Sequence, residues 1–322
     1  MRKRTNSAIR RWMYAMVYLV VSAVVLAGCG GGGGNGSGGS EPAAGDGKLK
    51  VTATTGMIAN AAAEVGGEHA EVTGLMGSGV DPHLYKASQG DIKKLDTADI
   101  IFYNGLHLEG KMAEMFEKME KKKPTVAVAR NLPESSLRTD PSGAHDPHIW
   151  FDVENWISAT EVIRDTFIAK DSAHEDDYRT QADAYIAELK KLDAYAAEQI
   201  ASIPEASRVL VTAHDAFGYF GDAYGIKVMG LQGISTASEY GSKDVSTLRD
   251  FLVENKIKAV FVESSVPKKS IEAVIEGASK MGHEVAIGGE LFSDALGKAG
   301  TNEGTYIGMV KHNVDTIVGA LK

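Results

Sequence analysis

Two Asp-Pro-His triplets are the residues most able to do chemistry in this chain, and they end at His83 and His148. Proline fixes its own φ and restricts the residue before it, so each histidine is presented from a stiff loop. A third histidine, His214, follows the apolar run Val209–Thr212, and a carboxylate, Asp294, follows a later apolar run. Open α/β sheets place their ligands at the carboxyl ends of such strands. The sequence therefore predicts one site built from three imidazoles and one carboxylate.

That donor set suits a divalent transition metal, because imidazole favours ions such as Zn, Cu, Ni, Fe and Mn and carboxylate tolerates the harder ones. A further carboxylate is expected to orient a ligating ring. Four aspartates are available for this role, and the sequence does not choose among them: Asp81, Asp146, Asp152 and Asp215. The remaining histidines lack such context, and of these His145 is the alternative ligand.

The elements around these residues alternate between short β-rich runs and helical runs. Strands are expected at 50–54, 70–74, 99–103, 125–128, 208–212, 227–230, 259–262 and 284–287. Helices are expected near 58–65, 88–95, 109–121, 245–254, 269–281 and 305–321. Such βα alternation predicts an α/β fold of two lobes, each with a parallel sheet flanked by helices.

Residues 174–203 contain neither Gly nor Pro and carry apolar residues at helical spacing. This segment is either a long surface helix within one domain or a rigid rod between two lobes, and we favour the rod. The expected division is an N-terminal lobe at 48–171, a linking helix at 172–203 and a C-terminal lobe at 204–322.

The N-terminus has the pattern of a lipoprotein export signal. Basic residues precede an apolar run from Trp12 to Leu26, and Leu-Ala-Gly-Cys ends at Cys29. We expect cleavage after residue 28, lipidation of Cys29, and a Gly-rich tether over 29–47. A plain secretory signal or N-terminal anchor is the alternative. The protein is then expected on the extracytoplasmic face of the cell membrane, held by lipid.

Composition narrows the function classes. The 322 residues carry a net charge of −9, which argues against a nucleic-acid partner. The single cysteine can form neither an internal disulfide nor a cysteine-cluster metal site. Apart from residues 12–26, no segment is apolar enough to enter a membrane, so a polytopic membrane protein is excluded.

The motifs around the four candidate ligands resemble those of the metal-binding lipoproteins that serve manganese or zinc ABC importers, the cluster A-I solute-binding proteins. The resemblance is carried by DPHLY at 81–85, HDPHIW at 145–150, TAHDAFGYF at 212–220, and LFSD at 291–294. It implies two α/β lobes joined by one long helix, and it implies His83, His148, His214 and Asp294 as ligands. Its implied partners are a permease and an ATPase, with the receptor itself a monomer.

The resemblance leaves the metal open between manganese, which we favour, and zinc. Zinc-specific relatives often carry a His-rich loop, whereas residues 131–144 contain no histidine. A site with three imidazoles nevertheless binds Zn²⁺ more tightly than Mn²⁺. The competing function is a secreted zinc-dependent hydrolase, which needs an open metal position and a nearby base such as Glu239 or Glu263. Four protein ligands close the site, so we expect no enzyme; an adhesin is a secondary possibility.

Overall fold

The computed structural model describes residues 47–322, and the export signal, Cys29 and nearly all of the expected tether lie outside them. The described chain begins with a four-stranded parallel sheet in the order β2-β1-β3-β4. Its strands are β1 (Leu49–Ala53), β2 (Ala70–Gly74), β3 (Ile100–Tyr103) and β4 (Thr125–Ala127). Residue 70 pairs with 49 and residue 100 with 51, so the carboxyl ends of the strands meet at one edge.

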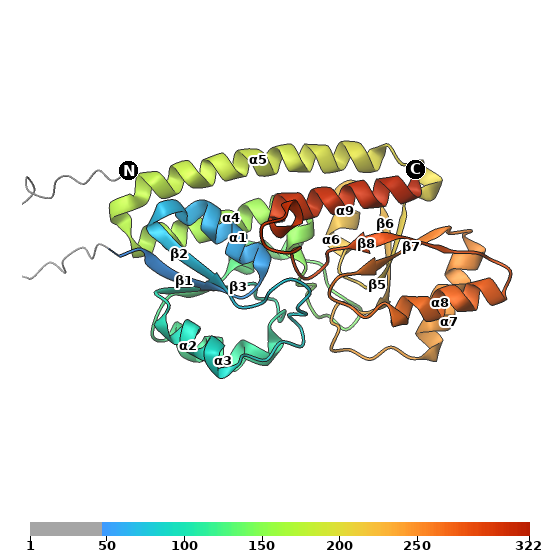
Figure 1. Cartoon of the computed structure of the whole chain (residues 1–322), viewed down its shortest axis with the longest axis horizontal. Helices are drawn as coiled ribbons and strands as arrows, with labels where there is room; N and C mark the ends of the chain where they lie inside the picture. Colours follow the sequence, from blue (N-terminus) through green and yellow to red (C-terminus); the bar gives the residue numbers. More distant parts are fainter. Residues whose placement is uncertain (1–46) are drawn as a thin grey trace, which may run out of the picture. The chain divides into compact units, whose positions relative to one another are not determined.

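Helices cover both faces of this sheet (Figure 1). One face carries α1 (Gly56–Gly66) and α4 (Val153–Lys170), which pack on each other, and the other carries α2 (Gln89–Thr97) and α3 (Ala113–Glu120). Helix α2 begins with a capping box in which Ser88 and Asp91 satisfy each other's backbone N–H groups. The N-terminal part of the chain is therefore a three-layer α/β unit.

The second half repeats this construction with two pairs of parallel strands. Strand β5 (Val209–His214) pairs with β6 (Lys227–Gln232), and β7 (Ala259–Glu263) pairs with β8 (Ala286–Leu291). Strands β5 and β7 lie side by side. The accompanying helices are α6 (Gly218–Tyr224), α7 (Ser242–Glu254), α8 (Lys269–Lys280) and α9 (Tyr306–Leu321). Helices α7 and α8 pack together, while α9 lies on β8.

The two halves are connected in the chain by α5 (Glu175–Ala201), a 27-residue helix that runs along one side of both and packs on α4, α1 and α9 (Figure 1). Its buried face follows the apolar spacing of the sequence, from Tyr178 through Leu189 to Ile200. The fold is thus α/β, with parallel sheets flanked by helices and one long helix, as expected. The helix itself is shorter than 172–203, because residues 172–174 form a 3₁₀ turn before it.

A continuous hydrophobic core joins elements from both halves. The indole of Trp156 on α4 stacks on Tyr306 of α9 with ring centroids 5.0 Å apart, and Phe151 stacks on Phe217 at 4.2 Å. All four side chains are almost completely buried. Because both halves pack on this shared apolar core, we expect their loops to keep fixed positions relative to one another.

Two helices of the structure, α4 and α6, were not predicted from the sequence. Helix α4 is buried against α1, α5 and the 3₁₀ turn after β4. Its buried positions lie on several sides and include the polar residues Asn155 and Thr160. The sequence therefore lacks the single apolar stripe that predicts an amphipathic helix. Helix α6 is only seven residues long. Strand β8 begins two residues later than expected and continues through Gly288-Gly289, residues that rarely signal a strand.

Short 3₁₀ turns complete the described chain: η1 (Gly67–His69), η2 (Gly110–Met112), η3 (Val128–Asn131), η4 (Glu134–Ser136), η5 (Ile149–Phe151), η6 (Ser172–His174), η7 (Glu205–Ser207) and η8 (Asn302–Gly304). Within residues 47–322, none of the helices combines the length and the apolar character that crossing a bilayer requires.

Candidate metal centre

The four candidate ligands arrive from four separate segments. His83 lies on the loop between β2 and α2, and His148 immediately precedes η5. His214 is the last residue of β5, and Asp294 follows β8 by three residues. Two segments thus come from each half, and the parallel strands bring them to one edge, where open α/β sheets bind their ligands.

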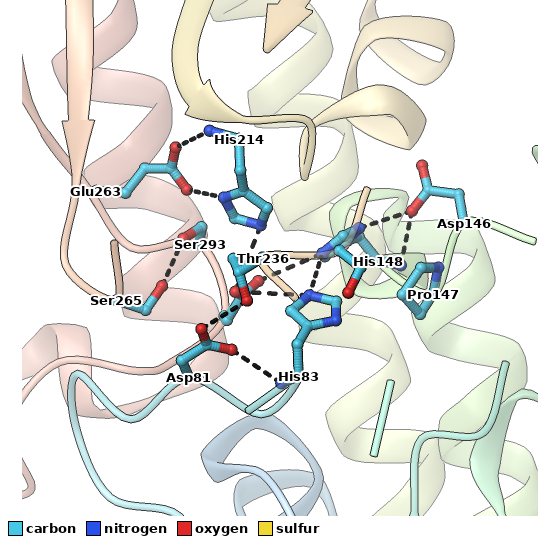
Figure 2. Close-up of polar contacts among 12 residues, drawn as sticks. Asp81, His83, Asp146, Pro147, His148, His214, Thr236, Glu263, Ser265 and Ser293 are labelled. Atoms are coloured by element: carbon cyan, nitrogen blue, oxygen red, sulfur yellow. Dashed lines mark hydrogen bonds and ion pairs between the residues drawn. The ribbon is translucent and has the colours of Figure 1, made fainter. Parts of the chain in front are cut away.

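Their side-chain tips converge on one point. Figure 2 shows the three histidine rings turned toward one another there. One ligand atom from each residue lies within 4.8 Å of all the others, and all four residues are buried. The Nε2 atoms of His83 and His148 are 3.3 Å apart. The Asp294 oxygens lie 3.4 Å from Nε2 of His148, 3.4 Å from Nε2 of His214 and 3.8 Å from Nε2 of His83. Tetrahedral ligands at metal bonds of about 2.1 Å are themselves about 3.4 Å apart, so the spacing suits one ion.

Several of these polar atoms are buried without a hydrogen bond. Among the described residues, His214 Nε2 and both carboxylate oxygens of Asp294 have no hydrogen-bond partner. Leaving such groups unsatisfied costs about 1–3 kcal/mol each, and more for a charged group. A bound cation removes that cost, so the burial that destabilises the empty cluster favours metal binding.

Carboxylates behind two of the rings fix which nitrogen faces the cluster. Asp146 Oδ1 accepts hydrogen bonds from Nδ1 of His148 at 2.7 Å and from its backbone N–H at 3.0 Å. Glu263 holds His214 in the same way, accepting from Nδ1 and, at 2.8 Å, from the backbone N–H (Figure 2). Because Nδ1 keeps its proton for the carboxylate, Nε2 is the nitrogen of each ring that faces Asp294 and can bind a metal ion.

The three histidines differ in basicity because their surroundings differ. Burial lowers the pKa of His83 to about 4, and the Asp294 charge opposes this only in part. Burial also acts against a charged His148, but the charge and hydrogen bond of Asp146, with Asp294, outweigh it and raise the pKa of His148 to about 9. Burial is likewise outweighed at His214, where Glu263 and Asp294 raise the pKa well above its usual value.

Asp294 stays ionised inside this cluster. Burial raises the pKa of the carboxyl group, yet the charge of His214 and the close approach of His148 and His214, each 3.4 Å away, hold the pKa well below its usual range. The site without metal therefore contains an anionic carboxylate paired with imidazoles that carry protons. An incoming cation replaces those protons.

Hydrogen bonds between the two halves of the fold hold the ligand segments in place. Trp150 Nε1 donates to the carbonyl of Ser293 at 3.0 Å, which ties the segment after His148 to the residue before Asp294. The hydroxyl of Tyr219 on α6 donates to the carbonyl of Asp146 at 3.0 Å. These bonds are buried, so they are protected from competition by water.

The other residues singled out from the sequence have different roles. Asp152 caps α4, and its side chain accepts from the N–H of Glu154. His145 pairs with Thr139 in an isolated bridge and lies 3.6 Å from Glu134, outside the four-residue cluster. The orienting role of Glu263 was not predicted from the sequence, where this residue was only a possible base. The available signal was its place at the end of β7, the strand beside the one that ends in His214.

Comparison with known proteins places this geometry in a family. Residues 51–320 match the family described as ZnuA, zinc-uptake complex component A, periplasmic. The chain is 52% identical over 308 residues to the manganese-binding lipoprotein MntA of Bacillus subtilis, covering 95% of this chain and 98% of that protein. It is 33% identical over 277 residues to the iron ABC transporter substrate-binding lipoprotein MtsA of Streptococcus pyogenes, covering 84% and 88%.

A solved structure shares both fold and sequence. The periplasmic zinc-binding protein TroA of Treponema pallidum superimposes with a TM-score of 0.84 at 48% identity, covering 85% of this chain and 99% of that one. The fold and its buried site therefore define a metal-binding component of the solute-binding type. The chain belongs to the ZnuA family of metal-binding proteins.

Proposed function

We propose that this protein is an extracytoplasmic receptor that binds one divalent transition metal ion as cargo and delivers it to an ABC permease and its ATPase. The observation that carries the proposal is the convergence of four buried ligand atoms within 4.8 Å of one another. Relatives named as substrate-binding lipoproteins of metal transporters support the delivery step.

The proposed ligands are Nε2 of His83, His148 and His214 and the carboxylate of Asp294. Two neutral imidazoles oriented by carboxylates donate strongly, and the Asp294 charge offsets half of the charge of a divalent ion. Because the ligands lie at loops and strand ends, we expect the ion to leave the rest of the fold unchanged.

Manganese is the cargo that we favour, with zinc next. The support is the 52% identity to a manganese-binding lipoprotein, against 48% to the zinc-binding protein TroA. A site of three imidazoles still binds Zn²⁺ more tightly in solution, by the usual order of affinities. Tighter binding in solution therefore does not identify the metal that is delivered. We expect the availability of each metal and its release to the permease to decide the cargo.

We further propose that the protein is a receptor and not an enzyme. Hydrolytic metal sites keep a coordination position open for water, whereas four protein ligands fill a tetrahedral ion. Both carboxylates nearest the ligating rings, Asp146 and Glu263, already accept two hydrogen bonds each. Neither is placed as a free base, which disfavours a secreted zinc-dependent hydrolase.

The proposed organisation is a monomer with lobes at 48–171 and 204–322 joined through 172–203, tethered over 29–47 to a lipid on Cys29. Replacing Cys29 with serine removes the thiol that lipidation requires. The variant is expected to lose its place in the membrane fraction or to stay unprocessed. Wild-type processing and membrane association in the variant would contradict the anchor.

The receptor function is tested by pairing a binding measurement with an activity measurement. His214→Ala removes one ligand, so affinity for Mn²⁺ and Zn²⁺ is expected to fall while the metal-free fold is preserved. The metal-loaded wild type is expected to show no turnover of ester, phosphoester or peptide substrates. Metal-dependent turnover would contradict the receptor function, and unchanged affinity in the variant would remove His214 from the site.

A further inference from the structure

His83 is held differently from the other two histidines. Among the described residues, no carboxylate binds its ring from behind, whereas Asp146 and Glu263 do this for His148 and His214. The next residue, Leu84, is 50% exposed, so the His83 loop borders solvent. His83 is therefore the candidate ligand with the least support from the interior.

What holds this loop is a hydrogen-bond chain that crosses the site (Figure 2). Asp81 Oδ1 accepts from the backbone N–H of His83 at 2.8 Å. The other oxygen, Oδ2, accepts from the hydroxyl of Thr236 at 2.6 Å, and Thr236 belongs to the opposite half of the fold. Asp81 thus joins His83 to the segment after β6, which we call the 233–241 loop.

The 233–241 loop is in turn fastened to the strand end that carries His214. The side-chain amide of Gln232 donates to the carbonyl of Thr236 at 2.8 Å, and the Gln232 carbonyl accepts from the N–H of Asp215 at 3.0 Å. In the β5–β6 ladder His214 lies opposite Gln232. The chain of bonds therefore runs from one candidate ligand to another through Thr236 and Asp81.

The Thr236–Asp81 bond is only partly buried, unlike the bonds that fasten the other ligand segments. Water competes for it, so it can open without disturbing the core. Opening the Thr236–Asp81 bond releases the main polar attachment of this loop to the opposite half.

We propose that Thr236 and Asp81 form a latch that keeps His83 on the metal, and that opening of this latch sets the rate at which the ion leaves. The inference rests on the proposed function, since it assigns the release step of that same site. Thr236 acts through Asp81 and His83 and does not touch the ion, so it is a positioning residue. The latch governs dissociation more than association, because the other three ligands stay in place when it opens.

The test uses Thr236→Val, which keeps the branched shape and removes the hydroxyl, and Thr236→Ser, which keeps the hydroxyl. Each protein is loaded with one equivalent of Zn²⁺ and mixed rapidly with excess chromophoric chelator, and the association rate is measured separately. Loss of a hydrogen bond to a charged group predicts dissociation about tenfold faster in Thr236→Val. Thr236→Ser is expected to match the wild type, and association rates are expected to agree among all three.

The possible outcomes distinguish failure of the latch from failure of the proposed receptor function. Equal dissociation rates in Thr236→Val and wild type would overturn the latch while leaving metal binding intact. A Thr236→Ser variant as fast as Thr236→Val would also overturn it, because the effect would then come from shape. A wild type that binds neither Zn²⁺ nor Mn²⁺ would overturn the proposed function and the latch together. The thermal midpoint of each metal-free variant checks that the fold is preserved.

Discussion

At the scale of single residues, the centre depends on carboxylates that never touch the proposed ion. Asp146 and Glu263 each accept two hydrogen bonds from the histidine that they orient. This arrangement fixes the orientation of each ring before metal arrives, and it makes Nε2 a stronger donor once metal has displaced its proton. The orientation of the rings is therefore already present in the metal-free protein.

Replacing Glu263 with glutamine tests this role. Glutamine has a similar shape but only one accepting oxygen and no charge, so one of the two His214 donors loses its partner. Metal affinity is expected to fall about 10- to 100-fold, the usual cost of losing such a partner. Glu254→Gln, at the exposed end of α7, is the matched control and is expected to bind as the wild type does. Calorimetric titration that finds equal affinities in both variants would contradict the orienting role.

The protonation of the rings predicts the pH dependence of binding. His148 has a raised pKa of about 9, and the pKa of His214 is also raised, so both hold protons at neutral pH without metal. Metal needs those nitrogens deprotonated, so affinity is expected to rise with pH, by about tenfold per pH unit for each proton displaced. Calorimetry between pH 6 and 8 measures this. A plateau above pH 6.5, the ordinary histidine range, would contradict the raised values.

At the scale of secondary-structure elements, α5 provides stability and no ligand. Its buried face packs on α1, α4 and α9, and Leu189 lies fully buried in the middle of it. Leu189→Ala is expected to lower the free energy of unfolding by about 2–5 kcal/mol, since it leaves a cavity. Chemical denaturation measures this, with the exposed neighbour Lys190→Ala as control. Because α5 carries none of the candidate ligands, a large loss of metal affinity in folded Leu189→Ala protein would contradict this division of roles.

The same elements show why much of the fold could be predicted from the sequence. Strands such as Ile100–Tyr103 are short apolar runs between clear breaks, and α5 keeps one apolar face over its whole length, so local pattern identifies both. Helix α4 is enclosed on several sides, and its burial depends on neighbours that lie far away in the sequence. The convergence of His83, His148, His214 and Asp294 was predictable because each follows a stiff turn or a strand end. The pairing of Glu263 with His214 depends on the adjacency of β5 and β7, which no local pattern reports.

At the scale of the whole described chain, one core serves both halves and keeps the site assembled. Stacking between Trp156 and Tyr306 and between Phe151 and Phe217 buries aromatic surface where the halves meet. A large hinge motion would expose that surface to water, at about 25 cal/mol for each Å² of apolar area. Metal entry and exit are therefore expected to involve local loops rather than separation of the halves.

Metal binding to this preassembled site is expected to stabilise the whole protein. An ion that binds only the native state adds about 2.7 kcal/mol to the free energy of unfolding at a concentration 100 times Kd. Thermal denaturation with and without Mn²⁺ or Zn²⁺ should therefore show a rise in midpoint. Asp294→Ala removes the only anionic candidate ligand and is expected to abolish the rise. An equal rise in that variant would mean that metal stabilises the protein from elsewhere.

The most direct test of the central claim is the location of the ion. Crystals of the described chain grown with one equivalent of Mn²⁺ or Zn²⁺ can be measured at the absorption edge of that metal, so that anomalous scattering marks its position. We expect one strong peak, about 2.0–2.2 Å from Nε2 of His83, His148 and His214 and from the carboxylate of Asp294. A principal peak at any other group of residues, or metal-loaded protein without a peak among these four side chains, would contradict it.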